Sequence, residues 1–136
     1  MAQAKKAQKE LSFSKAFSSF SVNDLKKAKA FYQEKLGVDV KEQEEGLKLT
    51  FDGGNNVFIY PKDDHKPATF TVLNFPVDDI DTAVEKLTKA GVEFESYKGE
   101  LETDKKGVFR GGDKGMGPNI AWFKDPAGNF LSVIEE

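Results

Sequence analysis

Few residues of this 136-residue chain carry side chains that could do chemistry. The only histidine, His65, lies in the segment Asp63-Asp64-His65-Lys66. An imidazole titrates near neutral pH, so it can act as a general base or as a metal ligand. The two aspartates beside it could complete a weak cation site. A charged segment of this kind is also typical of a solvated linker, and that is the interpretation we favour. The chain has no cysteine, which excludes disulfides and thiol chemistry.

The other candidates are hydroxyl, amide and carboxylate groups. Ser19, Asn74 and Ser132 could each bond a ligand, one another or water. A serine nucleophile needs an adjacent general base, and the sequence predicts none. Glu135 and Glu136 are interpreted as solvated carboxylates. The glycines of residues 111–115 lack the Lys-Ser/Thr pair of a phosphate-binding loop.

The elements that must position these residues occur as two copies of one unit. Phe20-x-Val22-x-Asp24-Leu25 recurs as Phe75-x-Val77-x-Asp79-Ile80, and Gly37-Val38 recurs as Gly91-Val92. Two long copies indicate a duplicated supersecondary structure, because a solenoid needs three or more stacked repeats. We expect a pocket between the two copies.

The first copy is predicted to be a βαβββ unit. A strand over residues 17–22 leads into a helix with Asn23 or Asp24 as N-cap, and Gly37 ends this helix. Apolar residues recur through it at helical spacing. Three short strands follow, over residues 38–41, 47–51 and 57–60.

The second copy repeats this order. It has a strand over residues 69–77, a helix over residues 78–90 that Gly91 ends, and a strand over residues 92–97. A hairpin of residues 119–123 and 130–134 completes it. The glycine-rich segment 98–118 is predicted to be a mobile loop, with residues 107–118 as a lid, because long loops in compact domains are often functional.

Strand alternation predicts which side chains point away from the helices and into the pocket. This set mixes apolar groups with a few neutral polar ones, which suits a small organic ligand. Trp122 could stack on such a ligand or belong to the core, and Tyr60 is expected to line the pocket. The predicted ligand-binding residues are Phe17, Ser19, Val72, Asn74, Trp122 and Ser132.

Two motifs carry a resemblance to a known family. The helix Asp24-Leu25-x-x-Ala28-x-x-Phe31-Tyr32-x-x-x-Leu36-Gly37 and the ending Lys124-Asp125-Pro126-Ala127-Gly128-Asn129 resemble the vicinal oxygen chelate superfamily. That superfamily contains glyoxalase I, extradiol dioxygenases, and fosfomycin- and bleomycin-resistance proteins. The resemblance covers about residues 15–135. It implies an α+β fold in which two βαβββ modules form a cup of two facing mixed sheets, with the helices outside.

In enzymes of the superfamily, the resemblance implies a divalent metal at the bottom of the cup. Its ligands are His, Glu or Gln on the first and fourth strands of each unit. Carried onto this sequence, those positions are Phe17, Val72 and Ser132, together with Phe58 or Ile59. None is a metal ligand, because a divalent site needs several converging N or O donors. We therefore expect no metal, no cofactor and no catalytic residue.

Composition narrows the remaining choices. The net charge of −3, with both signs dispersed along the chain, argues against nucleic acid as a partner. No apolar run reaches the length of a membrane span, and no secretion signal is found, so a cytoplasmic location is expected. We expect a tail over residues 1–14 and one domain over residues 15–136, with modules at 15–62 and 68–136. The expected partners are a small-molecule ligand and, in a homodimer, a second copy of the chain.

Three functions remain open. The first is a metal-free protein that binds a small, partly apolar molecule in its cup. The second is a metal-dependent lyase or dioxygenase that uses unusual ligands. The third is a structural domain whose cup is filled by its own side chains, such as Phe17, Phe58 and Phe130.

Overall fold

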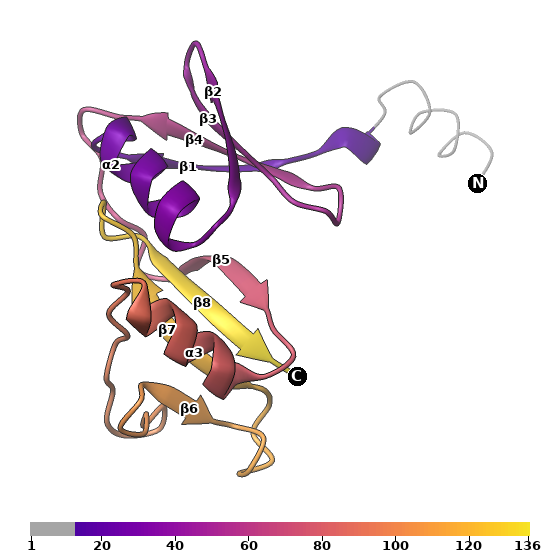
Figure 1. The fold of residues 1–136 in the computed structure, drawn as a ribbon, viewed down its shortest axis with the longest axis vertical. Coiled ribbons are helices and arrows are strands. Elements are labelled where there is room, and N and C mark those ends of the chain that lie inside the picture. Colours follow the sequence, from indigo (N-terminus) through magenta and orange to yellow (C-terminus); the bar gives the residue numbers. More distant parts are fainter. Residues whose placement is uncertain (1–12) are drawn as a thin grey trace, which may run out of the picture.

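The computed structural model describes residues 13–136 as two βαβββ modules that follow one another along the long axis of the molecule (Figure 1). A 3-10 turn, η1, precedes the first module, and an α-helix continues there into a π-helical turn, η2. The elements of this half are η1 (Phe13–Lys15), β1 (Ser18–Val22), α2 (Leu25–Ala30), η2 (Phe31–Lys35), β2 (Asp39–Gln43), β3 (Gly46–Thr50) and β4 (Asn56–Pro61). Those of the second module are β5 (Thr71–Pro76), α3 (Ile80–Lys89), β6 (Val108–Arg110), β7 (Asn119–Lys124) and β8 (Phe130–Glu135).

Each module forms one mixed four-stranded sheet. The strand order is β1-β4-β3-β2 in the first sheet and β5-β8-β7-β6 in the second. In both sheets the first strand pairs in parallel with the last, and the other pairs are antiparallel. In the view of Figure 1, α2 and α3 both lie in front of the sheets. The predicted α+β fold of two βαβββ modules is confirmed.

The two helices begin with the same local signal, an aspartate N-cap. The side chain of Asp24 accepts a hydrogen bond from Lys27 N, and that of Asp79 accepts one from Thr82 N, both at 3.1 Å. These caps satisfy backbone donors that a helix start leaves unpaired.

No helix within residues 13–136 is both long and apolar enough to cross a membrane.

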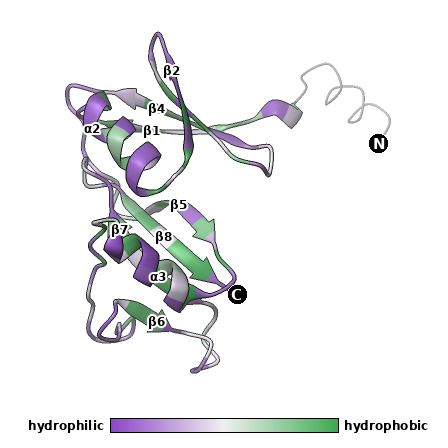
Figure 2. Cartoon of the chain, viewed as in Figure 1, coloured by the Kyte–Doolittle hydropathy of each residue, from purple (hydrophilic) through white to green (hydrophobic). Residues whose placement is uncertain are grey.

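The core lies between the helices and one face of each sheet. Strand β8 is coloured hydrophobic along most of its length in Figure 2, whereas α3 shows a hydrophilic side to the viewer. On α3, Ile80 and Val84 are buried, and Ala121 and Val133 of the sheet are buried with them. Burying one aliphatic side chain of this size contributes roughly 1.5–3 kcal/mol. Burial of this face therefore holds each helix on its sheet.

The second strand of the second module differs from its prediction. Residues 92–97 form no strand, and only Phe94 makes an isolated bridge, to Phe123. The strand is instead β6, inside the segment that was predicted to be a mobile loop. Val108 is 0% exposed because it pairs with Ala121 and belongs to the core, whereas Phe109, 4% exposed, lies on the other side of the sheet beside Trp122. The prediction of a lid over residues 107–118 is therefore wrong at β6.

Strand β6 is further held by ion pairs. The guanidinium of Arg110 donates two hydrogen bonds to Asp81 of α3, at 3.1 and 2.5 Å, and one to Asp104 at 3.1 Å. The hydrogen bond from Arg110 is the main cause that lowers the pKa of Asp81 below its ordinary value. These bonds link the edge strand to the helix.

Candidate functional site

The first candidate surface is the side of the first sheet that carries no helix. In the pairing of β1 with β4, Ser19 lies opposite Phe58 and Ser21 lies opposite Tyr60, so these four side chains share one side. The rings of Phe58 and Tyr60 are stacked, with centroids 6.3 Å apart and planes inclined by 16°. We call these four residues the aromatic face. Phe58 rather than Ile59 lies here, because Ile59 is fully buried in the core.

The second candidate surface is the corresponding side of the second sheet. Asn74, Ser132 and Trp122 lie in register across β5, β8 and β7, and we call them the polar row. Ser132 is fully buried, and its hydroxyl donates to Oδ1 of Asn74 at 2.5 Å. Trp122 is half-buried, with the ring of Tyr97 centred 5.6 Å away. Of the alternatives open for Ser132 and Asn74, the structure shows that they bond each other.

The predicted site residues therefore come together in two groups. Phe17 is 64% exposed and lines a shallow cavity of about 200 Å³ with Phe58. Val72 lies at an irregularity in the pairing of β5 with β8. Within residues 13–136, neither Val72 nor any member of the polar row lines one of the four main cavities. The two groups thus share none of these cavities within a single chain.

A buried polar network, which sequence reasoning missed, joins the two modules. Asn129 Nδ2 donates to Asp125 Oδ2 at 3.0 Å and to the backbone oxygen of Ser21 at 2.9 Å. Asp125 Oδ2 also accepts a hydrogen bond from Tyr32. Burial, reinforced by the nearby Asp125 carboxylate, raises the pKa of Tyr32 well above its ordinary value. The motif Lys124-Asp125-Pro126-Ala127-Gly128-Asn129 contained the signal, but its partners lie in the other module.

His65 belongs to the same junction, and its interpretation as a solvated linker residue is wrong. The ring is half-buried, and both nitrogens are bonded. Nε2 lies 3.0 Å from the backbone oxygen of Ala127, and Nδ1 lies 2.7 Å from Ser21 Oγ. Because a carbonyl can only accept, Nε2 must carry the proton, and in the neutral ring Nδ1 then accepts from the serine. His65 thus connects β1 to the turn between β7 and β8.

Glu135 is also not the solvated carboxylate that was predicted. Its Oε2 accepts a hydrogen bond from Ile80 N at 2.8 Å, and its Oε1 accepts one from Asn119 Nδ2 at 2.9 Å. Ile80 is the first residue of α3, where a negative charge is favourable. Glu135 therefore supports the start of a helix that lies far from it in sequence.

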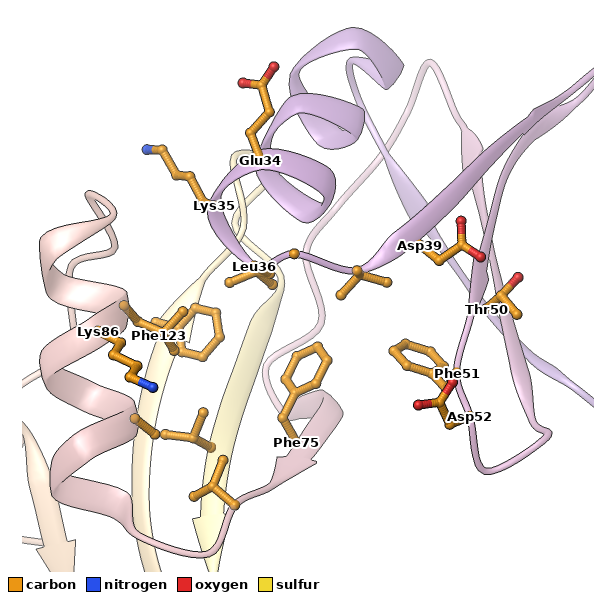
Figure 3. Close-up of a pocket in the computed structure, with 16 residues that line it drawn as sticks. Glu34, Lys35, Leu36, Asp39, Thr50, Phe51, Asp52, Phe75, Lys86 and Phe123 are labelled. Carbon is orange, nitrogen blue, oxygen red and sulfur yellow. The ribbon is translucent and has the colours of Figure 1, made fainter.

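A cleft of about 660 Å³ separates the two modules on the side of the helices (Figure 3). Leu36 and Phe51 line it from the first module, and Phe75 and Phe123 from the second. Charged side chains also line it, namely Glu34, Lys35, Asp39, Asp52 and Lys86. None of the predicted ligand-binding residues lines this cleft.

Comparison with known proteins decides the family. A model of the Glyoxalase/Bleomycin resistance protein/Dioxygenase superfamily matches residues 17–133. The chain belongs to this superfamily. A search of curated proteins found no significant match.

Solved structures of the superfamily fold are similar to the chain over most of its length. A glyoxalase/bleomycin resistance protein/dioxygenase superfamily member from Sphaerobacter thermophilus is 26% identical, with 89% of this chain and 96% of that chain covered and a TM-score of 0.62. TnmS3, an antibiotic binding protein from Streptomyces sp. CB03234, is 23% identical, with coverages of 88% and 94% and a TM-score of 0.60. The fosfomycin resistance protein FosX from Listeria monocytogenes is 16% identical, with coverages of 89% and 91% and a TM-score of 0.63.

The metal that the superfamily resemblance implies does not fit the residues present. Phe17, Phe58 and Val72 have no donor atom, and the hydroxyl of Ser132 is bonded to Asn74. Among residues 13–136, no three or more His, Cys, Asp or Glu side chains are grouped so that they could hold a metal. A divalent cation needs several converging N or O donors. The residues at these positions therefore do not form the donor set of a divalent metal site.

Proposed function

We propose that the protein binds a small, partly apolar organic molecule on the helix-free faces of its sheets, without a metal. The observation that carries this proposal is the make-up of those faces. An aromatic stack lies beside Ser19 on one sheet, and Trp122 lies beside the bonded pair Ser132 and Asn74 on the other. Apolar walls with a few neutral polar groups are characteristic of small-molecule sites. The similarity to an antibiotic binding protein supports the same class of ligand.

The proposed site favours binding over catalysis. The proposed ligand-binding side chains include no carboxylate, imidazole or amine, so they offer no general acid or base. His65 lies in the module junction, where both of its ring nitrogens are already bonded. The proposed ligand-binding residues are Phe17, Ser19, Val72, Asn74, Trp122 and Ser132.

The proposal includes a homodimer. Phe17 and Phe70 are 64% and 68% exposed, which is unusual for side chains of this size. The aromatic face and the polar row share none of the main cavities within one chain. A second copy that set its polar row against the aromatic face of the first would cover exposed rings and complete a cup.

The test is an NMR titration of the full chain with small aromatic and thioether compounds. We expect amide shifts in residues 17–21 and 72–76 for compounds that bind. Val72→Trp should abolish these shifts, and Val72→Ile should keep them. A melting curve of each variant checks folding, because overpacking can cost about 1–3 kcal/mol. Shifts confined to the helices would contradict the proposed site.

Analytical ultracentrifugation tests the homodimer separately. We expect a dimer for the native chain and a weakened one for Phe17→Ser. Leu101→Ser, which changes another exposed apolar residue, is the control. A native chain that stays monomeric at high micromolar concentration would refute the dimer and leave the titration to decide the ligand site.

A further inference from the structure

The cleft of Figure 3 has walls from both halves of the chain. Val38 and Phe51 come from the first module, and Phe75 and Leu87 from the second. The rings of Phe51 and Phe75 make an edge-to-face contact, with centroids 6.1 Å apart and planes inclined by 63°. The volume of about 660 Å³ lies within the range of roughly 300–1,000 Å³ that is typical of small-molecule sites.

Five charged side chains line the cleft: Glu34, Lys35, Asp39 and Asp52 from the first module, and Lys86 from the second. In Figure 3 the side chains of Glu34 and Lys35 point away from the rings of Phe51 and Phe75. The ammonium group of Lys86, on α3, points into the cleft in Figure 3, and Asp52 lies beside Phe51 on the other wall. Neither takes part in any of the ion pairs found in residues 13–136. By contrast Lys89, on the same helix, pairs with Glu85 at 3.2 Å. Lys86 and Asp52 thus have no ion-pair partner within residues 13–136, and the same holds for Glu34, Lys35 and Asp39 of the lining.

A hydroxyl in the same wall is also unsatisfied. Thr50 lines the cleft next to Phe51 and Asp52 in the sequence. In the described part of the chain, Thr50 Oγ1 is the one buried side-chain N or O atom without a hydrogen-bond partner. Buried polar groups are usually paired, so this hydroxyl is an exception in the cleft wall.

We propose that the cleft binds a small aromatic molecule with a carboxylate at one end and an ammonium group at the other. The ring packs against Phe51 and Phe75, the carboxylate pairs with Lys86, and the ammonium group pairs with Asp52. An uncharged molecule would pair neither charge, and because Lys86 and Asp52 are both exposed the difference is that of a surface ion pair. A singly charged molecule would pair only one of them. Of the three, only the zwitterion pairs both Lys86 and Asp52.

The cleft is separate from the ligand site proposed on the aromatic face and the polar row. Phe75, Phe123 and Val133 of its lining lie on the helix side of the second sheet, whereas the polar row lies on the other side. In the first sheet, Asp39 and Thr50 of the lining share the side of Phe58, at the end of the sheet that faces the second module. Because the walls of the cleft come from both modules, a bound molecule would bridge them. Because the cleft exists only in the folded chain, a molecule that binds there should raise the melting temperature of the protein as its concentration increases.

The experiment titrates 4-(aminomethyl)benzoate into the full chain and follows amide shifts by NMR. We expect saturable shifts in residues 36–39, 50–52 and 75–77, and a rise in melting temperature. 4-Methylbenzoate and 4-methylbenzylamine, which each keep one charge, should bind about 1.5- to fivefold more weakly, since a partly exposed ion pair has about that effect. Val72→Trp should leave these titrations unchanged.

Two charge variants assign the ends of the molecule. In Lys86→Gln, 4-(aminomethyl)benzoate should bind no more tightly than 4-methylbenzylamine. In Asp52→Asn, it should bind no more tightly than 4-methylbenzoate. Lys89→Gln is the matched control, because it removes a lysine from the same helix outside the cleft lining. The proposal is overturned if no saturable shift occurs at millimolar concentration. It is equally overturned if the shifts lie on residues 17–21, or if Lys86→Gln has no more effect than Lys89→Gln.

Discussion

The phenol of Tyr32 donates a hydrogen bond of 2.7 Å to Oδ2 of Asp125, and both side chains are buried. Tyr32 lies in η2 of the first module, and Asp125 lies in the turn after β7 of the second. The ring of Phe31 packs edge-to-face on Tyr32, with centroids 5.3 Å apart, and also contacts Phe123. Apolar surroundings strengthen such a bond electrostatically, so it is a main link between the modules.

We expect Tyr32→Phe to lower the free energy of unfolding by about 1.5–3 kcal/mol, the usual contribution of a hydrogen bond to a charged group. Urea denaturation followed by circular dichroism measures this. Tyr60→Phe, which removes a hydroxyl from the aromatic face, is the control and should change it by less than about 0.5 kcal/mol. Equal losses in the two variants would mean that the bond to Asp125 has no special role.

Stability should fall in alkali because of Tyr32. Burial and Asp125 raise its pKa in the folded state above the ordinary value of 10.0. The stabilisation is complete below pH 10, where both states hold the proton. This stabilisation is lost as the pH rises further, because the tyrosine ionises first in the unfolded chain. The free energy of unfolding then falls by about 1.4 kcal/mol per pH unit. The difference between the native chain and Tyr32→Phe isolates this effect, and parallel curves from pH 9 to 11 would contradict it.

His65→Ala should destabilise the chain by about 1–3 kcal/mol, because two hydrogen bonds of roughly 0.5–1.5 kcal/mol each are lost. A double-mutant cycle with Ser21→Ala should give a coupling of at least about 0.5 kcal/mol, since the side chains are in contact. The ¹⁵N chemical shifts of the ring should show a protonated Nε2 and an unprotonated Nδ1. The opposite tautomer would refute the bond from Nε2 to Ala127.

Arg110→Ala should loosen β6 more than it lowers global stability. The residue is partly exposed, so the loss in free energy should stay below about 1 kcal/mol. Hydrogen exchange of the Phe109 amide, which lies in the pairing of β6 with β7, should become faster. The hydrogen bond from Arg110 lowers the pKa of Asp81 in the folded state. The stabilisation from this bond is therefore complete above the ordinary carboxyl pKa and is lost as the pH falls from there through the lowered pKa. Unchanged exchange in Arg110→Ala would show that strand pairing alone holds β6.

Chelators should leave the protein unchanged. We expect the melting temperature to be the same with and without EDTA, and elemental analysis to find no stoichiometric Zn, Mn, Ni or Fe. A metal present at 100 times its dissociation constant would add about 2.7 kcal/mol to the free energy of unfolding, and a thermal melting curve would detect this change. One tightly bound metal per chain would contradict the metal-free proposal.

Much of the fold could be predicted because its signals are local. Asp24 and Asp79 cap helices through hydrogen bonds to residues three positions ahead. Gly37 and Gly91 follow the helices with φ of 70° and 98°, which glycine adopts more readily than other residues. Strand alternation likewise depends on neighbours in the sequence, and it correctly placed Ser19 and Asn74 away from the core-facing side chains.

The errors all concern residues whose partners are distant in sequence. Residues 92–97 have the apolar content of a strand, but Val108–Arg110 occupy the edge beside β7 instead. The carboxylate of Glu135 bonds Ile80 N, and His65 reaches Ser21 and Ala127. The sequence by itself therefore determined the helices, most strands and the superfamily resemblance. Which segment became the edge strand, which polar groups were buried and where the clefts lie were decided only by the packing of the two modules, because hydrogen-bond partners far apart in sequence leave no local pattern.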